Sequence, residues 1–154
     1  MSASTLYRYL SLVVGAFFVL TIDLLTKFWF FGYEAPIIGD FIRFERHENY
    51  GLSFNIPVPV LVPLFVALLA LVAVSIYVYR EGERLNVLMI VALALFVGGT
   101  IGNAYDRMAF GYVRDWIAIY RSIFNLADVF ILVGLGVLLT KWPRHTGPTP
   151  GQLR

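Results

Sequence analysis

The sequence contains no cysteine, which excludes disulfide bonds, thiol catalysis and thiolate metal sites. Its two histidines, His47 and His145, are far apart and are expected in different loops, so no histidine-based metal site is predicted. The net charge of +2 is too small to indicate a nucleic-acid partner. We therefore expect no metal, no other cofactor and no nucleic acid.

Charged residues are also scarce. They make up 14% of the 154 residues, whereas a soluble domain carries about 25%. Four apolar runs are each long enough to cross a bilayer, which takes about 20 residues, and they cover residues 10–31, 58–79, 85–105 and 123–142. We predict an all-α membrane protein with four transmembrane helices, forming a single domain over residues 1–142, with a loop at residues 106–122. The tail, residues 143–154, is rich in Pro, Gly and Thr and is predicted to be disordered.

The long connection between the first two runs contains a short stretch with strand character. Apolar and charged residues alternate over residues 41–46, which favours a strand. Asn49-Tyr50-Gly51 then has the composition of a turn, so a small hairpin or cradle is predicted here. Asn49 and Gly51 can be explained by this turn alone or by a role in a binding site.

The first and third runs carry residues that a plain membrane anchor does not need. Asp23 and Lys27 are four residues apart and share one helix face. They form either an ion pair that anchors the helix end or part of a polar site shared with later aspartates. In the third run, Gly98 and Gly102 form a Gly-x-x-x-Gly pair, which indicates close packing against another helix.

Polar residues are concentrated between Gly98 and Asp128, at the junction of the third and fourth runs. A charge at membrane depth costs about 2.5 kcal/mol or more, so such residues are expected only where they pair or function. Asn125 and Asp128 have the spacing of a helix capping box, which is the structural alternative. If the fourth helix starts at Ile123, however, Asp128 lies roughly 7 Å inside it. Asn103 and Asp106 repeat the spacing at a helix end, where capping does not explain it.

Two carboxylates held close together can share one proton, because they cannot both ionise cheaply. One then acts as a base that activates water, and the other as an acid that polarises a carbonyl and protonates the leaving amine. This chemistry hydrolyses a peptide without serine, cysteine or metal. We predict that Asp115 and Asp128 form such a catalytic pair, with neighbouring Asn and Arg side chains holding the substrate backbone.

Three other functions are compatible with intramembrane charges. A small transporter or proton channel would spread polar residues through the membrane depth, whereas here they gather near one face. A Ser-Lys hydrolase would use Lys27 as base and Ser53 or Ser122 as nucleophile, but no motif pairs these residues. A structural assembly factor would have no chemistry. Peptide cleavage by the purified protein, with and without Asp115 and Asp128, distinguishes all four.

The polar motifs, taken in order, resemble those of the lipoprotein signal peptidases, or signal peptidase II, an aspartyl membrane protease family. The matching motifs are Asp23-x-x-Thr26-Lys27, Asn49-x-Gly51-x-x-Phe54, Gly102-Asn103-x-x-Asp106-Arg107 with Gly111-x-Val113-x-Asp115, and Phe124-Asn125-x-Ala127-Asp128. Each motif is weak alone, but four in this order along the chain are specific. The chain departs from the family at Leu52-Ser53, where small residues are usual, and this bears on local loop packing.

The resemblance implies four transmembrane helices with a small extracytoplasmic β-cradle. It implies a diacylglyceryl-modified bacterial prolipoprotein as substrate, cleaved just before the lipidated cysteine to release the signal peptide. Asp115 and Asp128 would be the catalytic dyad. The residues that would bind or orient the substrate, or support the site, are Asp23, Lys27, Asn49, Gly51, Asn103, Asp106, Arg107 and Asn125. Globomycin-type cyclic peptides would be inhibitors, and a monomer in contact with membrane lipid is expected.

The distribution of Lys and Arg predicts the orientation. One side would carry Arg8, Arg80, Arg84, Lys141, Arg144 and Arg154, and the other Arg43, Arg46, Arg107, Arg114 and Arg121. The bias strengthens if Arg107 and Arg114 belong to the site instead of free loops. We expect a multi-pass protein of the bacterial cytoplasmic (inner) membrane, with both termini in the cytoplasm and the aspartates at the outer face.

Overall fold

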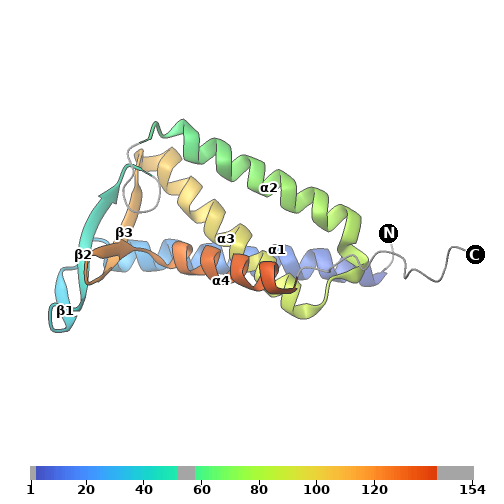
Figure 1. Cartoon of the computed structure of the whole chain (residues 1–154), viewed down its shortest axis with the longest axis horizontal. Helices are drawn as coiled ribbons and strands as arrows, with labels where there is room; N and C mark the ends of the chain where they lie inside the picture. The colour runs from blue at the N-terminus through green and yellow to red at the C-terminus, as the bar shows by residue number, and fades with distance from the viewer. Residues whose placement is uncertain (1–2, 52–57, 142–154) are drawn as a thin grey trace, which may run out of the picture.

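The computed structural model describes residues 3–51 and 58–141. The Leu52-Ser53 departure and the predicted tail at residues 143–154 lie outside this range. Within it the chain is mostly helical with one small sheet (Figure 1). The elements in order are α1 (Ala3–Phe30), β1 (Ala35–Ile38), β2 (Ile42–Asn49), α2 (Leu61–Glu81), the 3-10 turn η2 (Gly82–Arg84), α3 (Val87–Phe110), β3 (Val113–Ile119), β4 (Ser122–Phe124) and α4 (Leu126–Lys141).

Three of the described helices are long and apolar enough to cross a membrane: Thr5–Phe30, Leu61–Arg84 and Val87–Phe110. The prediction of four spans is not confirmed, because α4 has only 16 residues. At 1.5 Å per residue it is about 24 Å long, short of the roughly 30 Å hydrocarbon core. The apolar run that starts at Ile123 first completes strand β4, so fewer of its residues are left for the helix.

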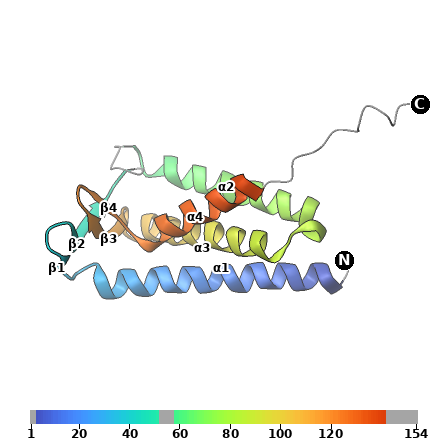
Figure 2. The ribbon, with the colours of Figure 1, turned by 60° about the horizontal axis from the view of Figure 1, so that its bottom comes forward.

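The strands form one antiparallel sheet in the order β1-β2-β3-β4. It lies at one end of the helices, opposite the start of α1 (Figures 1 and 2). The β3–β4 hairpin joins α3 to α4, so the sheet is attached directly to both helices. This small sheet agrees with the expected cradle, and it includes β2 in place of the shorter strand predicted at residues 41–46.

The prediction of a loop from Asp106 to Ser122 was wrong. Helix α3 continues to Phe110 and ends at Gly111, whose φ of 82° suits glycine and whose N–H bonds to Arg107 O at 3.1 Å. Strand β3 then begins at Val113. Asp106 is therefore a helix residue, and Asp115 lies on a strand.

Helix α3 lies between α1 and α4 (Figure 2), and its glycines allow close approach on both sides. A Cβ atom at Gly98 would lie 2.6 Å from Ala16 O in α1, and one at Gly99 would lie 2.7 Å from Ala127 O in α4. The predicted packing role of the Gly-x-x-x-Gly pair is thus confirmed for Gly98. Its second glycine, Gly102, faces the Asp23 carboxylate and makes room for it.

Helix α2 is joined to the other helices mainly near the end away from the sheet. A buried apolar cluster there contains Val78, Leu85, Met89, Ala92, Leu93 and Leu138. Tyr9 Oη donates to Val78 O at 3.0 Å, and Arg8 donates to the carbonyls of Gly82 and Glu83. Nearer the sheet, Pro63 is the one buried residue of the first half of α2. This arrangement leaves space between α2 and the other helices near the sheet.

Candidate active site

Asp115 is a buried carboxyl group on β3, with 0% of its surface exposed. Its Oδ1 accepts a hydrogen bond from Asn125 Nδ2 at 2.5 Å, and its Oδ2 accepts one from Asn49 Nδ2 at 3.1 Å. Asn49 reaches it because the register pairs Asn49 with Val113, so Asn49 is a diagonal neighbour of Asp115 across the sheet. The structure therefore brings residues 49, 115 and 125 together.

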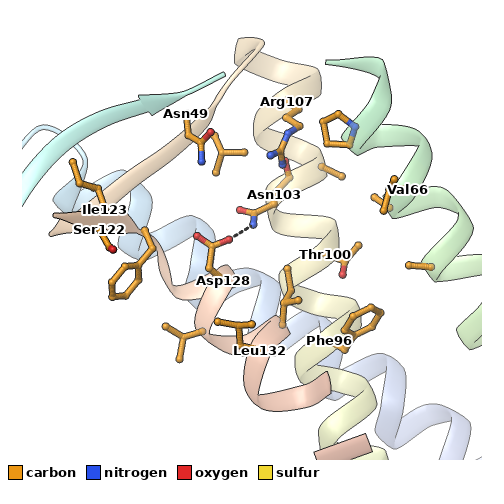
Figure 3. Close-up of a pocket in the computed structure, with 18 of the residues that line it drawn as sticks. Asn49, Val66, Phe96, Thr100, Asn103, Arg107, Ser122, Ile123, Asp128 and Leu132 are labelled. Carbon is orange, nitrogen blue, oxygen red and sulfur yellow. Dashed lines mark hydrogen bonds between the residues drawn. The ribbon is translucent and has the colours of Figure 1, made fainter. Parts of the chain in front are cut away.

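Asp128 lies in the first turn of α4 and contacts α3. Its Oδ1 accepts a hydrogen bond from Asn103 Nδ2 at 2.8 Å (Figure 3). Its Oδ2 accepts one from the backbone N–H of Asn125 at 3.3 Å, while Asp128 N–H donates to Asn125 Oδ1 at 3.2 Å. This reciprocal pair is a capping box. The capping alternative is therefore correct, and the prediction that Asp128 lies well inside the helix is wrong, because α4 starts at Leu126.

Capping does not account for all the contacts of Asn125. Its side-chain oxygen caps α4, while its side-chain nitrogen donates to Asp115. One amide group thus links the backbone that carries Asp128 to the carboxyl of Asp115. It holds the two aspartates in one site although they come from different elements.

The surroundings of Asp115 favour its protonated form. Burial raises the pKa of Asp115 from 3.8 to about 7, and the charge of Asp128 adds to the rise. The hydrogen bonds from Asn125 and Asn49 oppose it. Near neutral pH the Asp115 carboxyl can therefore hold a proton, which is the state that a general acid requires.

Lys27 and Asp23 form a fully buried ion pair, with Lys27 Nζ 2.8 Å from Asp23 Oδ2. Lys27 Nζ also lies 3.2 Å from Asp106 Oδ2 and donates to Asn103 Oδ1 at 3.0 Å. The pair is therefore part of a polar network shared with α3 and does more than anchor the end of α1. Such contacts are needed because a buried ion pair loses its hydration.

The two aspartates of this network also hold the chain beside the proposed catalytic residues. Asp23 Oδ1 accepts from the backbone N–H of Ala127, next to Asp128, at 3.0 Å. Asp106 accepts from Arg114, next to Asp115, through the backbone N–H at 3.0 Å, Nε at 3.1 Å and Nη2 at 2.7 Å. Arg114 thus belongs to the site network.

Gly51 and Arg107 connect the end of β2 to α3. Arg107 Nη2 donates to Gly51 O at 2.9 Å, and its Nη1 donates to Asn103 O at 3.2 Å. The Gly51 N–H in turn donates to Asn49 Oδ1 at 3.0 Å. The turn therefore does not account for all the contacts of Asn49: one end of its amide shapes the local turn, and the other end contacts Asp115.

A cavity of about 950 Å³ opens between α2, α3, α4 and the sheet (Figure 3). Its walls are mainly apolar, with small residues such as Ala67 and Ala70 on α2 and larger ones such as Leu132 on α4. The polar residues that line it are His47, Asn49, Thr100, Asn103, Arg107, Arg121, Ser122 and Asp128. The Asp128 carboxyl thus meets an apolar space large enough for chains of a peptide or a lipid.

His47 is a site residue that the sequence analysis missed. It was expected in a loop, but it lies on β2, pairs with Asp115 across the sheet and lines the cavity. Its position two residues before Asn49 on an alternating strand could have indicated it. Within the described residues, no group of three or more His, Asp and Glu side chains could hold a metal ion.

Comparison with known proteins now identifies the family. A family model described as signal peptidase (SPase) II matches residues 15–142. The chain belongs to the signal peptidase II family. It is 30% identical over 148 residues to the lipoprotein signal peptidase of Aquifex aeolicus, covering 90% of this chain and 87% of that one. It is 36% identical over 132 residues to that of Moorella thermoacetica, covering 80% and 86%.

Two solved structures have the same fold. A bacterial membrane enzyme solved at 2.3 Å has a TM-score of 0.74 and 24% identity, over 90% of this chain and 94% of that one. A second, solved at 1.9 Å, has a TM-score of 0.73 and 25% identity, over 88% and 94%. As a member of the signal peptidase II family the chain is a membrane protease, and the transporter alternative is not favoured.

Proposed function

We propose that the chain is an aspartyl endopeptidase that removes the signal peptide from diacylglyceryl-modified bacterial prolipoproteins, cleaving just before the lipidated cysteine. The main supporting observation is the Asp115–Asn125–Asp128 arrangement beside an apolar cavity. Family membership supports the substrate, because the relatives are lipoprotein signal peptidases.

In the proposed mechanism Asp128 is the base and Asp115 is the acid. Ionised Asp128 takes a proton from a water molecule as the water oxygen attacks the scissile carbonyl carbon. Protonated Asp115 donates a hydrogen bond to the carbonyl oxygen and then its proton, which yields a tetrahedral diol. Collapse of the diol breaks the C–N bond, and the proton held by Asp128 passes to the leaving amine. The proton on the second hydroxyl returns to Asp115. The raised pKa of Asp115 supports this assignment.

The groups around the two carboxyls are suited to hold an extended peptide. Asn103 and Asn49 each hold one aspartate, and Arg107 lines the cavity with two of its nitrogens fixed by carbonyls. In the proposed complex Asn49, Gly51, Asn103, Arg107 and Asn125 orient the substrate backbone, while Asp23, Lys27 and Asp106 support them. The apolar walls of the cavity would accommodate acyl chains or apolar signal-peptide residues.

We further propose that the protein lies in the cytoplasmic membrane with both termini inside and the aspartates at the outer face. The sheet and the start of α1 lie at opposite ends of the helices (Figure 1), so a cytoplasmic N-terminus supports an outer site. A lipidated cysteine is then already at that depth, which raises its effective concentration. The proposal includes a monomeric enzyme in contact with lipid and inhibition by globomycin-type cyclic peptides.

The Ser-Lys alternative has no support in the described part of the chain. The hydrogen-bond and ion-pair partners of Lys27 Nζ there are two carboxylates and an amide oxygen, so its ammonium group is committed to the buried network. Ser122 lies on β4 and Ser53 lies outside the described residues. Ser122→Ala is expected to cleave like the wild type.

The decisive experiment is cleavage by purified protein in liposomes. One precursor is supplied with and without the diacylglyceryl group, to the wild type and to Asp115→Asn and Asp128→Asn. We expect cleavage of the lipidated form alone, by the wild type alone. Comparable kcat/KM for both precursors would reject the lipid requirement, and full activity in either variant would remove that residue from the dyad.

A further inference from the structure

His47 occupies a defined position relative to the proposed acid. It lies directly opposite Asp115 in the antiparallel pairing of β2 with β3. Opposite residues project from the same face of a sheet, with Cβ atoms about 5 Å apart. Asn49, two residues further along β2, projects from that face and bonds to Asp115. The His47 side chain therefore shares the face that carries Asp115.

The two side chains differ in their access to solvent. Asp115 is fully buried, and each of its oxygens accepts an amide N–H. His47 is partly exposed and lines the cavity, so its imidazole can exchange protons with water. Imidazole is also the side chain whose charge ordinarily changes between about pH 5 and 8. His47 can thus present a variable charge to a carboxyl that solvent does not reach.

The other charged groups around His47 come from several elements. Arg107 of α3, Asp128 of α4 and Arg121 of the β3–β4 turn line the same cavity. The neighbours of His47 on its own strand point to the opposite face, where Arg46 Nη2 lies 2.8 Å from Glu48 Oε1. Arg107 and Arg121 carry fixed positive charges, whereas an imidazole side chain carries a charge only when it is protonated.

We propose that His47 is a positioning residue that sets, through its charge, the pH at which Asp115 gives up the proton needed for peptide cleavage. A protonated imidazole stabilises the carboxylate form of Asp115, and a neutral imidazole leaves the acid form favoured. The proposal rests on the proposed function, in which Asp115 is the proton donor. The proposed effect of His47 on Asp115 does not require His47 to contact the substrate.

The first test is the pH profile of kcat/KM on the lipidated precursor. His47→Lys provides a permanent positive charge and is expected to move the alkaline limb down by about one pH unit, a tenfold loss on that limb. His47→Asn provides no charge and should move the limb upward. Glu48→Gln is the matched control, because it makes the net charge more positive by one from the neighbouring position on the opposite face.

The proposal would be overturned if the alkaline limbs of the wild type, His47→Lys and His47→Asn coincided. It would also be overturned if only KM changed, because a residue that merely shapes the cavity wall does not alter the proton affinity of Asp115. A shift in Glu48→Gln equal to that in His47→Lys would also overturn it, since a general charge effect would then suffice.

The second test does not depend on turnover. The difference in unfolding temperature between the wild type and Asp115→Asn, followed against pH, reports the ionisation of Asp115. When both proteins also carry His47→Lys, the midpoint of this difference should move to lower pH, and when both carry His47→Asn it should move to higher pH. A midpoint that stays in place would overturn the proposal. If the wild type failed to cleave the precursor, the proposed function would be rejected, while this measurement would still decide the role of His47.

Discussion

The ammonium group of Lys27 donates to the side-chain oxygen of Asn103 at 3.0 Å, and this contact orients the amide. With its oxygen directed at Lys27, Asn103 turns its nitrogen toward Asp128, to which it donates at 2.8 Å. The exchanged orientation would place an amide N–H against an ammonium group. A lysine on α1 therefore determines which kind of hydrogen bond a carboxylate on α4 receives.

Replacing Lys27 by Met should destabilise the protein and abolish cleavage. Asp23 and Asp106 would be left buried without their cation, which typically costs about 3–5 kcal/mol. Thermal unfolding and the cleavage assay measure the two effects. The double variant with Asp23→Asn should recover part of the stability. Wild-type stability in Lys27→Met alone would contradict the role of the network.

Asp115→Asn should change the pH dependence of stability. The folded pKa of Asp115, about 7, is above its ordinary value of 3.8, so ionising the group costs folding free energy. The wild type therefore loses stability relative to Asp115→Asn as the pH rises from about 4 to above 7, by up to about 4 kcal/mol. Below pH 4 the difference is independent of pH. Unfolding of both proteins at pH 4, 6 and 8 measures this difference in stability. A difference that does not change with pH would refute the raised pKa of Asp115.

Gly102→Ala should disrupt the buried network, because a methyl group there would overlap the Asp23 carboxylate. The expected result is a loss of stability of about 1–3 kcal/mol from overpacking and a strong loss of activity. Gly136→Ala in α4 is the control, since nothing lies within 4 Å of an added Cβ. The control should be neutral or slightly stabilising by helix propensity. Equal behaviour of the two variants would show that the contact with Asp23 is unimportant.

Asn125→Ser should separate capping from catalysis. Serine is a good N-cap, so α4 should keep its start and the stability should change little. The shorter side chain does not supply the amide that donates to Asp115, so kcat should fall at least tenfold. Circular dichroism and the cleavage assay give the comparison with Asn125→Ala, which also loses about 1 kcal/mol of capping. Wild-type kcat in Asn125→Ser would remove the link to Asp115 from the mechanism.

Filling the apolar cavity should weaken substrate binding. Ala70 on α2 lines the cavity, and Ala70→Phe would occupy part of it, so KM for the lipidated precursor should rise. Leu68→Phe is the matched control, because Leu68 is 58% exposed on the same helix and does not line the cavity. An unchanged KM in Ala70→Phe, with the protein folded, would show that substrate does not occupy this space.

The order and spacing of polar residues within apolar runs determined the membrane class, the three long helices and most of the candidate site residues. These properties are local: hydropathy selects membrane helices, and intramembrane Asp, Lys and Asn are retained only where they pair or function. The sequence therefore named Asp115, Asp128 and the Asp23–Lys27 pair. It could not distinguish an anchoring pair from a shared network, because that depends on which face of α3 meets α1.

The tertiary structure alone decided the sheet, the length of α4 and the place of His47. Strand β3 carries a buried aspartate, so its sequence pattern alone resembles that of a polar loop. Its identity as a strand follows from its pairing with β2. The apolar run after Arg121 supplies both a strand and a helix, and hydropathy does not separate the two. His47 lies 68 residues before Asp115 in the chain, and only the register of two antiparallel strands brings them opposite each other.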